Sequence, residues 1–326
     1  MIRPGVPGYL HCVSLPTPFP VGPVNAYLAE GEPLTLIDTG PRYRPAREAL
    51  NKGLRDRDCL VVDLQRILLT HAHVDHSGLA AELAAGSGAA VCTHTANLPR
   101  LAHEGGAHRT VFYIRMMRWA GVPIRMMMKL AKVRRNLGRY SEPLTPQHTI
   151  ADGDLLDLGG EDWRVLHTPG HTGGVICLYQ PQRKLLISSD HLLRDISSNP
   201  IIDPPDPGER ERPHRLVQYL EQLQRVAELD VALALPGHGS PITDHRSLIR
   251  KRLAFHRERA LRILRLLKDG SSTAYEIACV LFPSLDPVNT FLGISEVIGH
   301  LQWLEGDGLV ACEEVRGVAR WMQVAR

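Results

Sequence analysis

The segment THAHVDHSG, residues 70–78, places His71, His73, Asp75 and His76 within six residues. Three imidazoles and a carboxylate this close together cannot all be packing residues, because each needs a hydrogen-bond partner if it is buried. A transition metal satisfies them together, since imidazole nitrogen and carboxylate oxygen are ligands of zinc and iron. We expect His71 and His73 to point the same way from an extended stretch, while Asp75 and His76 turn toward a neighbouring position. Four ligands on one loop therefore predict two metal ions.

An apolar strand, RILLT (66–70), leads directly into this segment, and three more ligand-type residues follow later apolar strands. His171 lies in TPGHTGG, Asp190 in ISSDHLL and His238 in LPGHGSP. Glycines beside His171 and His238 let the backbone turn sharply and present the imidazole. Loops at the ends of strands in a rigid sheet are where functional residues usually lie. All seven side chains are therefore predicted to meet in one site.

Composition and length limit the class of protein. The chain has 326 residues, enough for two domains, and its 44% hydrophobic and 22% charged residues are typical of a globular protein. The longest apolar runs are too short for a membrane span, and the N-terminus lacks the plan of a signal peptide. Six cysteines form no CxxC pair, so no disulfide scaffold is indicated. We therefore predict a cytoplasmic protein with no membrane partner.

Strands and helices alternate through the first part of the chain, which predicts an α/β catalytic domain over residues 1–245. A stretch at about 94–148 interrupts this pattern. From Arg109 to Arg139 it contains nine Lys or Arg, no acidic residue and five of the seven methionines, and Pro123 should separate two short helices. One interpretation is a solvated helical hairpin packed on the core. The other is a lid over the metal edge, with methionines for an apolar group and arginines for an anionic one. The sequence leaves both open.

Residues 246–326 have a different, mainly helical pattern. An amphipathic helix over 248–270, two more helices at 273–282 and 293–308, and a final hairpin are the plan of a winged helix-turn-helix. The third helix contains Glu296 and Glu305 but no Lys or Arg, whereas a helix that reads DNA needs cations for the phosphates. DNA is therefore not the expected partner. We predict a structural and substrate-shaping unit and leave an RNA contact and a homo-oligomer open.

The motifs together resemble those of metallo-β-lactamase-fold hydrolases, nearest in pattern to glyoxalase II, over roughly residues 10–245. The tail resembles a subfamily that has a C-terminal winged-helix domain. The resemblance implies a four-layer αβ/βα sandwich with two metal ions at one edge. It also implies a role for each motif residue: His71, His73 and His171 hold the first metal, Asp75, His76 and His238 the second, Asp190 bridges both, and Asp38 in LIDTG orients a ligand imidazole.

Two metals that share a water would give a nucleophilic hydroxide without a protein nucleophile. The candidate catalytic carboxylates are Asp75 and Asp190, and Asp190 could pass a proton to the leaving group. We predict a metallohydrolase with two divalent ions, zinc in first place and iron or manganese as alternatives. The expected substrate is a small acyl compound, a thioester or lactone, with an apolar and an anionic part. An RNA phosphodiesterase and a mono-iron persulfide dioxygenase are the alternative functions.

Overall fold

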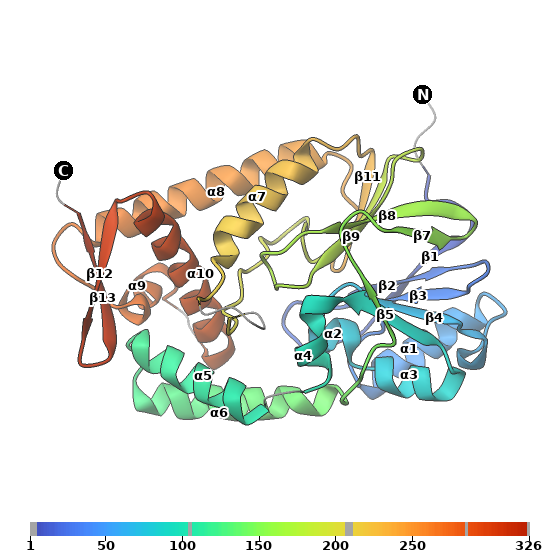
Figure 1. Cartoon of the computed structure of the whole chain (residues 1–326), viewed down its shortest axis with the longest axis horizontal. Coiled ribbons are helices and arrows are strands. Elements are labelled where there is room, and N and C mark those ends of the chain that lie inside the picture. The colour runs from blue at the N-terminus through green and yellow to red at the C-terminus, as the bar shows by residue number, and fades with distance from the viewer. Residues whose placement is uncertain (1–4, 104–105, 206–210, 284–285, 325–326) are drawn as a thin grey trace.

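Two β-sheets lie face to face in this computed structural model, which describes residues 5–103, 106–205, 211–283 and 286–324 (Figure 1). One sheet contains, in order, β1 (Leu10–Leu15), β2 (Val24–Ala29), β3 (Thr35–Ile37), β4 (Arg66–Leu69), β5 (Ala90–His94) and β6 (His148–Ile150). The other contains β11 (Leu233–Pro236), β10 (Leu185–Ser189), β9 (Ile176–Gln180), β8 (Glu161–His167) and β7 (Leu155–Leu158). Strands β3 to β6 are parallel neighbours, as are β10 and β11, so several strand ends that carry site residues share one edge.

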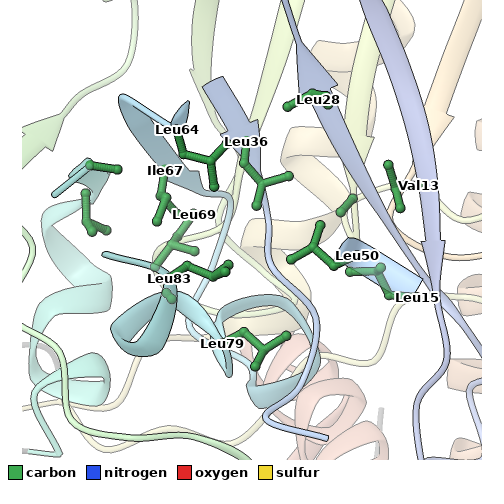
Figure 2. Close-up of a cluster of buried hydrophobic side chains, with 14 of the residues drawn as sticks. Val13, Leu15, Leu28, Leu36, Leu50, Leu64, Ile67, Leu69, Leu79 and Leu83 are labelled. Carbon is green, nitrogen blue, oxygen red and sulfur yellow. The ribbon is translucent and has the colours of Figure 1, made fainter. Parts of the chain in front are cut away.

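The sheets are apolar on both faces because each is covered twice. In β2, Tyr27 and Ala29 face the core between the sheets, while Ala26 and Leu28 face the outer core. Successive side chains of a strand point to opposite faces, so an almost continuous apolar run is what this position requires. Figure 2 shows the outer core, where β1, β2, β3 and β4 meet helices on one side.

Helices cover the outer face of each sheet, which completes four layers. On the first sheet lie α1 (Arg44–Arg55) and α3 (Ala80–Ser87), and on the second lie α7 (Arg215–Ala227) and the start of α8 (His245–Leu266). Helix α1 buries Ala46, Leu50 and Leu54, which are spaced by one turn of helix. The predicted αβ/βα sandwich is thus confirmed, although the sequence analysis did not single out α1 or α7.

The stretch predicted as an insertion at about 94–148 fills the connection between the adjacent strands β5 and β6. It contains α4 (Leu98–Leu101), α5 (Gly106–Trp119) and α6 (Ile124–Leu137), with short 3-10 turns at Thr95–Asn97 and Gly138–Tyr140. A third 3-10 turn, Val61–Asp63, and the single-turn helix α2 (Val74–Ser77) flank β4. Pro123 ends the linker before α6, as predicted.

Residues after β11 form α8, α9 (Ala274–Leu281), α10 (Pro287–Gly306) and the hairpin of β12 (Val310–Val315) and β13 (Val318–Gln323). The predicted order of three helices and a hairpin is therefore present. The boundary predicted at 245/246 falls inside the first turn of α8, because the Asp244 side chain accepts a hydrogen bond from Ser247 N and caps the helix at His245. Helix α10 begins at Pro287, six residues before the predicted start at residue 293. Proline is tolerated there because the first turn of a helix does not need its N–H.

The insertion and the tail share one hydrophobic core, which corrects part of the lid interpretation. Met116 and Met117 are 6% and 4% exposed and pack in the cluster that also contains Ile263 of α8 and Leu301 of α10. These two methionines are core residues and do not face a ligand. Met128, in contrast, is 68% exposed. None of the helices in the described ranges is long and apolar enough to cross a membrane.

Candidate metal centre

The predicted site residues lie in segments that follow the ends of strands, with Asp75 and His76 in the single-turn helix α2 after β4. Asp38 follows β3, His71 follows β4 and Asp190 follows β10, all at the shared edge. His238 follows β11, and its loop is held against the other sheet because Asn25 N–H donates to Gly237 O at 2.7 Å. The two sheets therefore fix the site between them.

His71, His73 and His171 form the first group of donors. His71 Nε2 lies 3.1 Å from His73 Nδ1, and His171 Nε2 lies 2.9 Å from the same atom. The three rings come from two loops that are far apart in the sequence. This arrangement agrees with the predicted composition of the first ligand group, and the three nitrogens could hold one metal ion.

Asp75, His76 and His238 form the second group. His76 Nε2 is 3.3 Å from His238 Nε2, and His238 Nε2 is 3.4 Å from Asp75 Oδ2. Asp190 lies between the groups: its Oδ1 is 3.3 Å from His76 Nε2, and its Oδ2 is 3.7 Å from both His171 Nε2 and His238 Nε2. The structure thus brings all seven predicted residues together.

The opposite ring nitrogens are used by the protein. His171 Nδ1 donates to Asn199 O at 2.8 Å, and His238 Nδ1 donates to Pro23 O at 2.8 Å. Their Nε2 atoms therefore point toward the other nitrogen and oxygen atoms of the two groups. Asp190 Oδ1 is buried and receives no hydrogen bond from the described residues. Converging imidazole nitrogens and carboxylate oxygens, with His171 and His238 held through their opposite ring nitrogens, fit a divalent transition metal such as zinc.

Asp38 lies behind the second group and orients it. Its Oδ2 accepts from His76 Nδ1 at 2.7 Å and from the Thr70 hydroxyl at 2.7 Å, and its Oδ1 accepts from Thr70 N–H at 2.8 Å. Its backbone has φ 58°, a left-handed conformation that Asp tolerates better than most residues. The carboxylate is 2% exposed and takes no part in the ligand groups, in agreement with the predicted orienting role.

Burial and charge set the protonation of the site. Burial, followed by the repulsion of neighbouring imidazoles, lowers the pKa of His71 well below its ordinary value, so this ring is neutral and can bind a metal. Burial lowers the pKa of His76, but the carboxylates of Asp190 and Asp38 outweigh it and raise the net pKa. Burial raises the pKa of Asp75, yet the hydrogen bond from His238 and the positive charges nearby bring it to about 2.

Some contributors carried no sequence signal. The Thr70 hydroxyl lies 3.2 Å from His71 Nδ1 and 2.6 Å from Ser189 Oγ, so a small hydroxyl network supports that ring. The Asn199 and Pro23 contacts use backbone carbonyls, which any residue offers. His167 and His191, which lie near ligand residues in the sequence, are outside the ligand groups: His167 stacks on His94, and His191 contacts the Tyr219 ring.

A further cluster of His256, Glu296 and His300 joins α8 to α10 away from the predicted ligands. His300 Nδ1 donates to Glu296 O at 2.7 Å, so His300 Nε2 accepts from His256 Nδ1 at 3.3 Å, and His256 Nε2 accepts from Ser197 Oγ at 3.1 Å. Arg259 pairs with Glu296 Oε1 at 2.9 Å. Hydrogen bonds thus satisfy this cluster without a metal.

Known proteins with similar sequences and structures indicate the family of this chain. The sequence profile of the Metallo-beta-lactamase superfamily matches residues 19–238. The chain is 35% identical to the "Probable metallo-hydrolase YqjP" of Bacillus subtilis, over 90% of this chain and 92% of that protein. It is 31% identical to the human "Acyl-coenzyme A thioesterase MBLAC2" over 51% of this chain and 57% of that protein. A metallo-beta-lactamase family protein of Thermus thermophilus has a similar structure, with a TM-score of 0.84, 28% identity and coverage of 98% and 100%.

A sandwich of two sheets with a His- and Asp-rich cluster at one edge defines a metal-dependent hydrolase. The profile match covers more than half of the chain, and the Bacillus relative is similar over nearly all of it. The chain belongs to the metallo-β-lactamase superfamily.

Proposed function

We propose that this chain hydrolyses acyl thioesters, with lactones as a related substrate class, using two divalent metal ions. Zinc is the first expectation, and iron and manganese are the alternatives. His71, His73 and His171 would hold one ion, and Asp75, His76 and His238 the other, with Asp190 between them. The observation that carries the proposal is the convergence of imidazole acceptors whose opposite nitrogens are already used. The human relative is named an acyl-coenzyme A thioesterase, which supports an acyl substrate.

When bound, the ions would lower the pKa of a water and polarise the substrate carbonyl. The chain supplies orientation and proton transfer. Asp190, which lies between the two groups, would carry a proton from the attacking water to the leaving thiolate. Asp75 remains a carboxylate above a pKa of about 2, so it can serve as an anionic ligand beside His238. The arrangement has no need of a serine or cysteine nucleophile.

The tail fits a winged-helix-like unit that is structural and substrate-shaping. Helix α10, the predicted third helix, is buried at Ile294, Val297, Ile298, Leu301 and Leu304. It contacts α6, α7, α8, α9 and β12, so little of its surface is available to enter a groove of DNA. This packing supports the expectation that the tail is not a DNA reader.

The test couples metal quantification to a hydrolysis screen over acyl-CoA, glutathione thioesters, lactones and RNA. We expect close to two transition-metal ions per chain and turnover of a thioester or lactone. Asp75→Ala and His238→Ala should each reduce the metal content toward one, whereas His148→Ala, at an exposed strand position, should leave it unchanged. Two ions in both Asp75→Ala and His238→Ala would refute the ligand assignment. Cleavage of RNA alone, or oxygen uptake with a persulfide by an iron form, would replace the proposed reaction.

A further inference from the structure

Three arginines from separate helices gather around Asp203 and Tyr113 beside the metal centre. Arg100 Nη1 of α4 and Arg109 Nη2 of α5 each lie 3.8 Å from Asp203 Oδ1. The Tyr113 hydroxyl lies 3.4 Å from the same oxygen, and the Arg134 guanidinium of α6 stacks 4.2 Å above the Tyr113 ring. The group therefore combines residues from α4, α5 and α6 with the segment that follows Asp190.

The charges in this group are not balanced. Asp203 supplies one carboxylate for three guanidinium groups, and both of its arginine contacts are longer than a hydrogen bond. Arg100 Nη1 is buried and has no acceptor in the described part of the chain. The side chains of Arg100 and Arg109 are 33% and 19% exposed, so solvent screens them only in part. Burial and the positive charges of Arg109 and Arg100 lower the pKa of Arg134, as expected where cations crowd together.

The arginine group is tied to the loop that carries His171. Asn97, three residues before Arg100, donates through Nδ2 to Gly174 O at 2.8 Å. Ile201, two residues before Asp203, donates its N–H to His171 O at 3.1 Å. Both segments thus contact the same loop of the metal centre.

We propose that Arg100, Arg109 and Arg134 form a binding subsite for a carboxylate or phosphate group of the substrate. The proposal rests on the thioesterase function and deepens it: the substrate is a thioester with an anionic group on its acyl or its carrier side. Guanidinium groups match the geometry of carboxylates and phosphates, and an anion would satisfy the donors that Asp203 leaves without a close partner. The basic character of the insertion thereby acquires a role in substrate selection.

Steady-state kinetics with three thioesters tests the subsite and locates the anionic group. Butyryl-N-acetylcysteamine is neutral, succinyl-N-acetylcysteamine is charged on the acyl side, and butyryl-CoA is charged on the carrier side. Arg109→Gln and Arg134→Gln should each raise KM about tenfold or more for one charged substrate, since a charge-assisted hydrogen bond contributes about 1.5–3 kcal/mol. The neutral thioester should be unaffected. Arg115→Gln and Arg135→Gln are matched controls on the same helices, because both side chains are exposed.

The same variants separate failure of the subsite from failure of the proposed reaction. Calorimetric titration of the metal-loaded protein with succinate or adenosine 3′,5′-bisphosphate measures anion binding without turnover. We expect one of these probes to bind wild type and the control variants at least tenfold more tightly than Arg109→Gln and Arg134→Gln. Equal binding by all five proteins would overturn the subsite, even if thioesters are hydrolysed. Impaired anion binding without hydrolysis of any thioester would retain the subsite and reject the thioesterase function.

Discussion

The backbone at Gly237 lies closer to the site than a side chain would permit. A Cβ at this position would clash with Asp190 Oδ1 and approach His76 Cε1 to 2.8 Å. The added Cβ would meet two proposed ligands, Asp190 and His76, so relieving the clash would displace at least one of them. We therefore expect Gly237→Ala to reduce the metal content, although it removes no ligand.

The control for this change is Gly138→Ala. Gly138 has an ordinary helical conformation and nothing near the position of an added Cβ. Metal analysis and the midpoint of thermal unfolding, measured with and without added zinc, separate a damaged site from a damaged fold. A wild-type metal content in Gly237→Ala would contradict this prediction and would mean that the loop after β11 accommodates the added Cβ.

Asp38 provides a second prediction at the scale of residues. Asn preserves its size and its tolerance of a positive φ, but it weakens the acceptor for His76 Nδ1–H and introduces a competing amide donor. Outer partners of metal-bound histidines typically contribute about 10–100-fold to metal affinity. We expect Asp38→Asn to weaken the second ion by a factor in this range, as measured by competition with a chelator. Asp58→Asn, which has φ 54° at an exposed position, is the matched control and should change nothing.

The sequence predicted the residues that meet in the site and one support, Asp38, but not the supports of His171 and His238. Imidazole and carboxylate side chains are rare enough in a row that their pattern in 70–78 predicts a metal site. In contrast, the carbonyls of Asn199 and Pro23 hold His171 and His238, and a backbone carbonyl has no residue signature. These contacts depend on how distant loops meet, which no local pattern encodes.

At the scale of elements, α10 is the centre of the tail. Leu301 is fully buried, and α10 packs against helices from the insertion, the sandwich and the tail. Replacing a buried leucine by alanine removes apolar contacts and leaves a cavity, at a cost of about 2–5 kcal/mol. We expect Leu301→Ala to reduce the free energy of unfolding by this amount in urea denaturation. Leu261→Ala on α8, where the leucine is 58% exposed, should change it by less than about 1 kcal/mol. Similar losses in the two variants would contradict the central position of α10.

Periodicity predicted which face of the tail helices is buried, because a helix that packs on one side repeats its apolar residues every three or four positions. It could not predict what covers the methionines of the insertion. Met116 and Met117 fit a lid and a core helix equally well in sequence. Only the tertiary arrangement, in which α5 meets the tail, assigns them to the core.

At the scale of the whole molecule, the insertion and the tail form one body with a shared hydrophobic core. Figure 1 shows α5 and α6 below the tail helices, between the hairpin and the sandwich. The shared core explains why a charged, methionine-rich stretch interrupts the β5–β6 connection: its apolar side stabilises the tail, and its arginines remain at the edge of the site. Two segments that the sequence analysis treated separately therefore pack together as one unit.

The His256 cluster makes the stability of this body depend on pH. Burial, with the positive charges of His300, Arg259 and Arg252, lowers the pKa of His256 to about 3. The other groups that face it are Glu296 of α10, Tyr219 of α7 and the Ser197 hydroxyl. In an unfolded chain the pKa is about 6.5, so between these values the unfolded state binds more protons. The free energy of unfolding should therefore fall as the pH decreases from about 6.5 to about 3, by at most about 1.4 kcal/mol per pH unit for this group.

A variant without the titrating ring isolates this contribution. We expect His256→Gln to lower stability at pH 7, because the hydrogen-bond chain to His300 and Ser197 is altered. Its stability should nevertheless decline less steeply than that of wild type between pH 6.5 and pH 4, measured by urea unfolding at fixed metal concentration. Buried His191, whose pKa burial lowers to about 3, is present in both proteins and cancels in the difference. His148→Gln, at an exposed position, should follow the wild-type curve. If the free energy of unfolding of wild type and His256→Gln fell in parallel with pH, His256 would not couple protonation to unfolding. The coupling is expected because a ring that only folding keeps neutral must take up a proton when the tail unfolds.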